Sequence, residues 1–292
     1  MNEDKLSNAD IEQLLKGIVI PPQPQIMVDL QIEQCMPDPD FGKISKLIAQ
    51  DPGLSGALLK LVNSSYFGLS TKVLSIHKAV SLLGSRSVVN IINSLSVREA
   101  LGNDQIISLN RFWDGAQDIA MTSLALAKHL SSENPDEMYA LGLFHDCGIP
   151  LMMKRFANYF PTLETAYAEV SENRRVVDYE NIHFNTNHAV VGHYISKAWQ
   201  LPDDLCISIA YHHNVIPIFK HKSPCTMRVK QHLAILKMAD NICKSSKILG
   251  NQKIDYEWKI VGAEILEQVG LSEYEFSQIK NDIIDFGATS YR

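Results

Sequence analysis

The chain has 292 residues, of which 46% are hydrophobic and 21% are charged, and its formal net charge at pH 7 is −6. This composition is typical of an ordinary globular protein and allows one large domain or two moderate ones. The lysines and arginines are scattered along an acidic chain. That pattern argues against direct binding to nucleic acid, which requires a basic surface.

The cysteines and the N-terminus indicate where the protein works. The number of cysteines is odd and no CxxC pair is present, which favours a reduced, cytoplasmic protein. The N-terminal stretch MNEDKLSNAD is too polar for a signal peptide. No apolar run approaches the ~20 residues that a membrane-spanning helix needs, so we expect no membrane contact. The cysteines are Cys35, Cys147, Cys206, Cys225 and Cys243.

The first part of the chain predicts a series of amphipathic helices. Residues 1–19 form a short lead-in, and PPQPQ at 21–25 is typical of a rigid linker or turn. Asp51 is placed as an N-cap with Pro52 at the first helical position, and Gly84 is placed as a helix stop. The helical patterns in this part cover residues 26–32, 44–48, 54–62, 76–83 and 88–97.

The second part continues the helical period and contains no convincing alternation of apolar and polar residues. We therefore predict an all-α fold. A division is placed near residues 102–111, between an N-terminal helical lobe at about 21–105 and a second lobe at about 106–220. Residues 221–292 are expected to complete the second lobe. The helical patterns here cover residues 112–130, 156–171, 188–200, 203–213, 228–247, 255–268 and 271–285.

One stretch in the second part carries charge inside an apolar run. YALGLFHDCGIPLMM, from Tyr139 to Met153, is almost wholly apolar but has His145 and Asp146 at its centre. A buried imidazole and carboxylate are costly unless they pair or bind a metal. Gly148 and Pro150 are predicted to break the helix just after this doublet. The partners of the doublet are therefore expected from elsewhere in the chain.

Candidate partners follow downstream in apolar helical segments. His188 opens HAVVGHYISKAWQLP, His212 and His213 stand in ISIAYHHN, and Asp240 closes LAILKMADN. Imidazole and carboxylate ligands together suit Fe, Mn, Zn or Mg. Adjacent helical positions point ~100° apart, so the sequence leaves open whether both adjacent histidines face one site. A hydrogen-bonded His–Asp cluster without an ion is the alternative interpretation. The candidate metal ligands are His145, Asp146, His188, His212, His213 and Asp240.

Several of these segments, taken in order, resemble a known family. IAQDPGLSGALLKLVNSSYFG, SIHKAVSLLG, ALGLFHDCGIPLM and HAVVGHYISKAWQLPDDL are similar to the HDOD family, the HD-related output domain of bacterial signalling proteins. The resemblance covers about residues 21–220, and it implies an all-α, HD-domain-like bundle within the HD phosphohydrolase superfamily. It also implies that His145 and Asp146 are the defining doublet and Asp240 the closing aspartate. His188, His212 and His213 match the additional histidines of the two-metal HD-GYP branch.

The sequence departs from the superfamily pattern in two places. The first histidine is expected in the helix that begins FWDGAQ, where this chain has Gly115. The Gly-Tyr-Pro signature of the HD-GYP branch is replaced by HHNVIPIFK. The first departure argues against full metal occupancy, and the second argues against hydrolysis of cyclic dinucleotides.

Two functions from different classes are consistent with these features. The first is a bacterial signalling or regulatory module with a degenerate metal site and little or no turnover, which contacts a signalling partner protein or a small ligand. The second is a metal-dependent phosphohydrolase, in which bound ions would activate water. The change at Gly115 favours the first, and the retained His/Asp set favours the second.

Overall fold

The computed structural model describes residues 14–15, 17–64, 67, 69–101, 107–131, 134–171, 173–220, 225–244 and 252–285. Within these ranges the chain is helical, and the only β-type pairing is an isolated bridge between Ser171 and Arg174. The prediction of an all-α fold is therefore confirmed. Most of the predicted lead-in, at 1–13, and half of the predicted division, at 102–106, lie outside the described residues.

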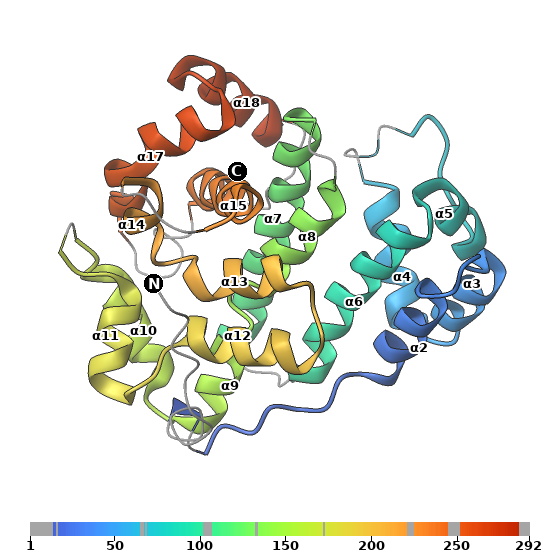
Figure 1. Cartoon of the computed structure of the whole chain (residues 1–292), viewed down its shortest axis with the longest axis horizontal. Helices are drawn as coiled ribbons and strands as arrows, with labels where there is room; N and C mark the ends of the chain where they lie inside the picture. Colours follow the sequence, from blue (N-terminus) through green and yellow to red (C-terminus); the bar gives the residue numbers. More distant parts are fainter. Residues whose placement is uncertain are drawn as a thin grey trace.

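The N-terminal helices form one side of the molecule (Figure 1). Asp51 caps α4 by accepting a hydrogen bond from the Leu54 N–H at 2.9 Å, with Pro52 in the first turn, as predicted. Gly84 ends α5 at φ 81°, a left-handed conformation that favours glycine. These helices are α2 (Gln25–Gln34), α3 (Phe41–Ala49), α4 (Pro52–Val62), α5 (Ile76–Leu83) and α6 (Ser85–Leu101).

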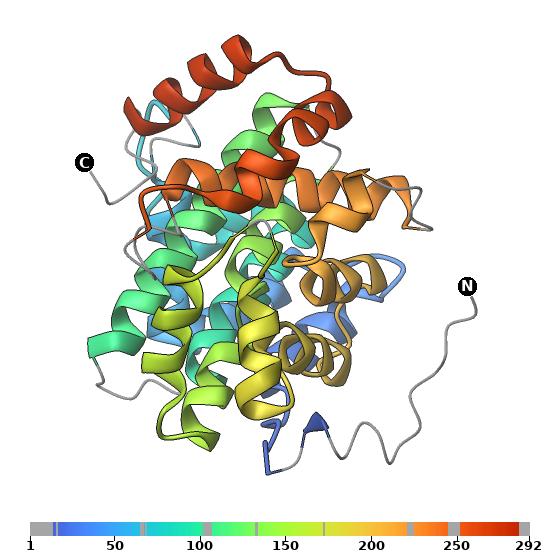
Figure 2. The same ribbon diagram turned by 90° about the vertical axis from the view of Figure 1, so that its left-hand side faces the viewer.

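Of the remaining helices, α15 packs on both α7 and α8, and α13 packs on α8. Helices α17 and α18 lie across one end of this group (Figures 1 and 2). None of the described helices is long and apolar enough to cross a membrane. These helices are α7 (Ile107–His129), α8 (Pro135–Phe144), α9 (Gly148–Arg155), α10 (Tyr159–Ala168), α11 (Val176–Phe184), α12 (His188–Ala198), α13 (Asp203–Tyr211), α14 (Val215–Lys220), α15 (Met227–Cys243), α17 (Tyr256–Val269) and α18 (Glu273–Asp285).

Helix α8 joins the two sides of the molecule. Its Glu137 carboxylate is buried and accepts hydrogen bonds from Arg86 of α6, at 3.0 Å, and from Arg228 of α15. On its other face, a Cβ on Gly142 would lie 2.6 Å from the Ala120 Cα, so only glycine allows α7 to approach this closely. The helix that leads into the His–Asp doublet is thus held on several faces before the doublet begins.

Candidate functional site

The His–Asp doublet lies in a break between two helices. Helix α8 ends at Phe144, His145 is its C-cap, and α9 begins at Gly148. The predicted break after the doublet, at Gly148 and Pro150, is therefore wrong in position, because both residues lie in the first turn of α9. A proline fits there because the first N–H groups of a helix have no partner within the helix. Gly148 is required for another reason, its contact with α12.

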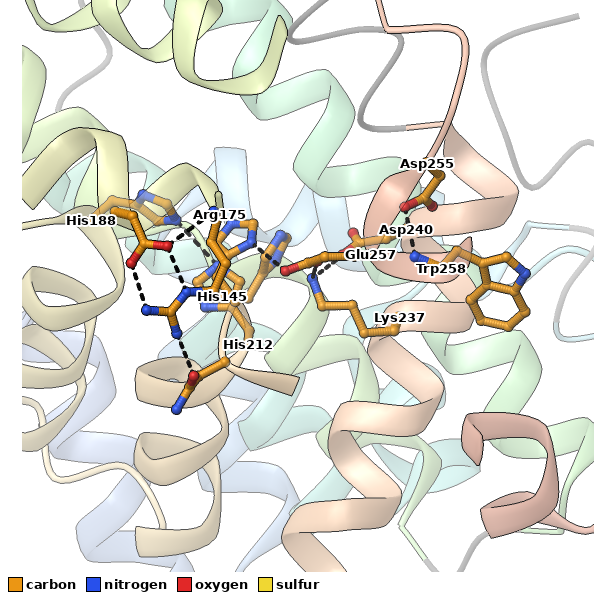
Figure 3. Close-up of polar contacts among 12 residues, drawn as sticks. His145, Arg175, His188, His212, Lys237, Asp240, Asp255, Glu257 and Trp258 are labelled. Atoms are coloured by element: carbon orange, nitrogen blue, oxygen red, sulfur yellow. Dashed lines mark hydrogen bonds and ion pairs between the residues drawn. The ribbon is translucent and has the colours of Figure 1, made fainter. Parts of the chain in front are cut away.

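Three imidazole nitrogens from three segments meet around the Asp146 carboxylate. Figure 3 shows the three histidines, His145, His188 and His212, side by side. Asp146 Oδ1 lies 3.3 Å from His188 Nε2 and 3.2 Å from His212 Nε2, and these two nitrogens are 3.2 Å apart. Asp146 Oδ2 lies 3.2 Å from His145 Nε2. All four residues are buried. Asp146 Oδ1 and the Nε2 atoms of His188 and His212 thus form a nearly equilateral triangle. The fourth atom, His145 Nε2, contacts the second carboxylate oxygen.

The second nitrogen of each of these imidazoles is bound to an acceptor. Each acceptor receives a hydrogen bond from Nδ1–H. A neutral ring in this tautomer therefore directs its Nε2 lone pair at Asp146. Lone pairs and a carboxylate facing one another require a proton or a cation between them. The Gly142 carbonyl oxygen lies 2.7 Å from His145 Nδ1, and the Ile209 carbonyl oxygen lies 2.7 Å from His212 Nδ1. The acceptor for His188 Nδ1 is Glu180 Oε2, at 2.6 Å.

Both adjacent histidines reach the site. Helix α13 ends at Tyr211, so His212 and His213 lie at its end rather than within regular helix, and their ring centroids are 4.3 Å apart. The His213 Nδ1 lies 3.3 Å from Glu257 Oε1, but its buried Nε2 has no hydrogen-bond partner. One ligand-type atom from each of Asp146, His188, His212 and His213 lies within 4.8 Å of the others. The unpartnered nitrogen fits a cluster built to hold a cation.

Asp240 approaches from the opposite wall and is paired with a lysine. The buried Lys237 Nζ lies 3.0 Å from Asp240 Oδ2 and 2.9 Å from Glu257 Oε2 (Figure 3). Lys237 and Asp240 are three residues apart on α15 and therefore share a face, whereas Glu257 comes from α17. This wall of the site is a network of one buried ammonium and two partly buried carboxylates.

A small cavity of about 40 Å³ lies between the two walls. His188 does not line the cavity; it stands behind Asp146 and His212, which do. Gly115 is absent from the lining; it is half-buried on α7, and a Cβ there would meet no atom within 4 Å. The structure thus brings the six predicted ligands together, while their metal-binding role stays a prediction. The cavity is lined by His145, Asp146, Tyr167, His212, His213, Lys237, Asp240, Asp255, Glu257, Trp258, Val261 and Ile265.

The imidazoles differ in their affinity for protons. Burial disfavours the charged form of His188, but the Glu180 and Asp146 carboxylates outweigh burial and raise its pKa to about 10. Burial lowers the pKa of His212 to about 4, against the opposing effect of Asp146. Burial likewise lowers the pKa of His213 to about 4. At neutral pH two of the rings therefore offer free lone pairs, and His188 carries the proton that balances Asp146.

Metal binding at this cluster should release a proton from His188. A metal ligand must be deprotonated, and the His188 pKa of about 10 means that the metal-free protein holds this proton at pH 7.5. Affinity for Mn²⁺ should therefore rise with pH up to about 10. Calorimetric titration in buffers of different ionisation enthalpy should show about one proton released per ion. Glu180→Gln removes the carboxylate that raises the pKa and should reduce the release; equal release from both proteins would contradict this assignment.

Several residues of the site were not predicted from the sequence. Glu180 is buried and receives hydrogen bonds from Tyr159 Oη at 2.5 Å and from the His188 ring. Lys237 and Glu257 form the opposite wall. A lysine inside the apolar run LAILKMADN was the available signal for Lys237. Glu180 and Glu257 stand among other polar residues, and nothing in their local pattern marks them as buried.

Comparison with known proteins identifies the family and the fold. The HDOD domain profile matches residues 20–215. An HDOD domain protein of unknown function from Geobacter sulfurreducens superposes with a TM-score of 0.70 over 94% of this chain and 92% of that one, at 22% identity. A candidate phosphohydrolase from Shewanella amazonensis superposes with a TM-score of 0.65 over 92% and 91% of the two chains, at 19% identity. At 22% and 19% identity, the similarity to these two structures shows a shared fold and nothing about activity.

Two curated relatives are considerably longer than this chain. An uncharacterized protein of Treponema pallidum is 28% identical over 199 residues, which are 67% of this chain and 38% of that protein. The cyclic di-GMP phosphodiesterase CdgJ of Vibrio cholerae is 27% identical over 131 residues, which are 45% of this chain and 23% of that protein. The shared segment is thus a minor part of each relative.

Proposed function

This chain belongs to the HDOD domain family, and we propose that it is a signalling module that holds one divalent ion and hydrolyses phosphodiesters slowly or not at all. The ion would be held by Asp146, His188 and His212, with His213 as a fourth ligand. The observation that carries the proposal is the 3.2–3.3 Å triangle of Asp146 Oδ1 and the two Nε2 atoms. Ligands at ~2.0–2.2 Å from one tetrahedral zinc-like ion are roughly 3.3–3.6 Å apart, close to these separations.

The ligand set also narrows the choice of ion. Imidazole nitrogens suit Zn and Fe, the Asp146 carboxylate also admits Mn, and Mg prefers a shell of oxygen ligands. Glu180 and the carbonyl oxygens behind His145 and His212 would fix the orientation of the rings, as outer partners of metal-bound histidines commonly do. A bound ion could lower the pKa of a water molecule and polarise a phosphate oxygen.

The limited space around the cluster supports low turnover. A water molecule needs a cavity of at least ~10–15 Å³, so a cavity of about 40 Å³ accommodates an ion with one or two waters. A cyclic dinucleotide is far larger and would require α17 to move away, because Trp258, Val261 and Ile265 of this helix line the cavity. The module would therefore act through contacts with a signalling partner protein or a small ligand.

A metal-dependent phosphodiesterase is the second candidate function. It is favoured by the retained cluster of Asp146 and histidines and by the similarity of part of the chain to CdgJ. In this case α17 would open to admit substrate, and the ion would contact a phosphate oxygen. The two functions differ in the number of ions bound and in the rate of hydrolysis.

Variants at Gly115 distinguish these functions. The open space beside this glycine admits a side chain, so Gly115→His should fold and, if the helix places the imidazole as the family resemblance implies, raise the metal content. Gly115→Ala adds no ligand and should leave it unchanged. Metal content by elemental analysis and cyclic di-GMP hydrolysis should be measured for both variants and the parent. Two ions per parent chain with rapid hydrolysis would favour the phosphodiesterase.

A further inference from the structure

We propose that the Lys237 ammonium is a built-in cation that takes the place of a second metal ion beside Asp240. This inference rests on the proposed function, because it concerns how many ions the same cavity can hold. It assigns to Lys237 a role in setting metal stoichiometry. Lys237 and Glu257 both lie beyond residue 215, where the match to the HDOD domain ends, so this feature comes from the C-terminal helices.

The position of the ammonium supports this role (Figure 3). Lys237 Nζ lies 3.0 Å from Asp240 Oδ2 and 2.9 Å from Glu257 Oε2, and all three residues line the cavity that His145 and Asp146 also line. The lysine is 4% exposed, so it is committed to this network rather than to solvent. A compact cation between two carboxylates, across a small cavity from a third, occupies the kind of position that a divalent ion takes in a two-metal site.

The charges around the cavity lead to the same conclusion. Asp146 faces the histidines, while Asp240 and Glu257 face Lys237. A divalent ion bound to Asp240 would lie beside the Lys237 ammonium, which is 3.0 Å from the same carboxylate. Two cations this close repel each other, so Lys237 disfavours the second ion. The fourth lining carboxylate, Asp255, is used as the N-cap of α17.

The test is the number of Mn²⁺ ions bound by Lys237→Gln and by the parent. The glutamine keeps a hydrogen-bond donor but removes the charge, so the variant should bind one more ion than the parent. Because metal pairs lie ~3.5–4 Å apart, the two ions should give an exchange-coupled electron paramagnetic resonance signal that the parent lacks. Lys237→Arg keeps the charge and should bind as the parent does. Lys220→Gln, which removes an exposed lysine paired with Glu264 of the same α17, is the matched control.

The difference in the number of bound Mn²⁺ ions between Lys237→Gln and the parent tests the role of Lys237 separately from the proposed function. A parent that binds no ion would defeat the proposed function, and a variant that nevertheless gains an ion would still support the role of Lys237. Equal counts in Lys237→Gln and the parent would overturn the inference. If Lys237→Gln does not fold with or without Mn²⁺, the parent itself supplies the second test. Two Mn²⁺ ions per parent chain with an exchange-coupled signal would overturn the inference, and a single uncoupled ion at saturating Mn²⁺ would support it.

Discussion

Asp146→Ala should both abolish ion binding and lower the free energy of unfolding of the metal-free protein by ~3–5 kcal/mol, the cost of breaking a buried ion pair. Its carboxylate is the common partner of three buried imidazoles, at 3.2–3.3 Å. Burial opposes ionisation of Asp146, but the histidines outweigh burial and hold its pKa well below the usual value. Removal of the carboxylate leaves the His188 proton without one of its two acidic partners.

Urea denaturation with EDTA present isolates the stability effect from the loss of metal. Asp203→Ala is the matched control, because Asp203 pairs with Lys197 on the surface, at 2.5 Å, and should leave the midpoint unchanged. Repeating the titration with Mn²⁺ should stabilise the parent but not Asp146→Ala, since a ligand that binds only the folded state raises stability. An unchanged midpoint for Asp146→Ala in EDTA would show that the carboxylate is not part of a buried network.

The sequence was sufficient for the features that depend on local pattern. The helical period predicted the all-α fold, and Asp51, Pro52 and Gly84 marked helix ends through capping and φ preferences that act within one turn. The apolar setting of His145 and Asp146 likewise predicted burial, which the structure has. These properties are set by neighbours along the chain, so they can be read before the tertiary structure is known.

The remaining features depend on which helices meet. Glu180 and Glu257 stand in polar segments and become site residues only because α11 lies beside α12 and α17 closes against α15. The full network around Lys237 could not be predicted for the same reason, since its second partner, Glu257, comes from α17. The break in the helix was placed too late because Gly148 looked like a stop signal, whereas its role is to admit the backbone of another helix.

Gly148→Ala should be among the most damaging single-methyl changes in the chain. An ideal Cβ at this position would lie 2.0 Å from the His188 carbonyl oxygen and 2.9 Å from the Gly192 nitrogen. Both atoms belong to the backbone of α12, so no side-chain rotation relieves the clash and the two helices must separate. The loss of stability should reach or exceed the ~1–3 kcal/mol typical of overpacked cores.

The same change should weaken the cluster without altering any ligand. His188 is the first residue of α12, so a shift of this helix moves its Nε2 away from His212 and Asp146. Ion affinity should therefore fall together with the denaturation midpoint. Gly56→Ala is the matched control, because Gly56 is an exposed residue within α4 with no atom within 4 Å of an added Cβ. It should stabilise the protein by ~0.5–1 kcal/mol, and a similar gain from Gly148→Ala would show that α9 and α12 are not in close contact.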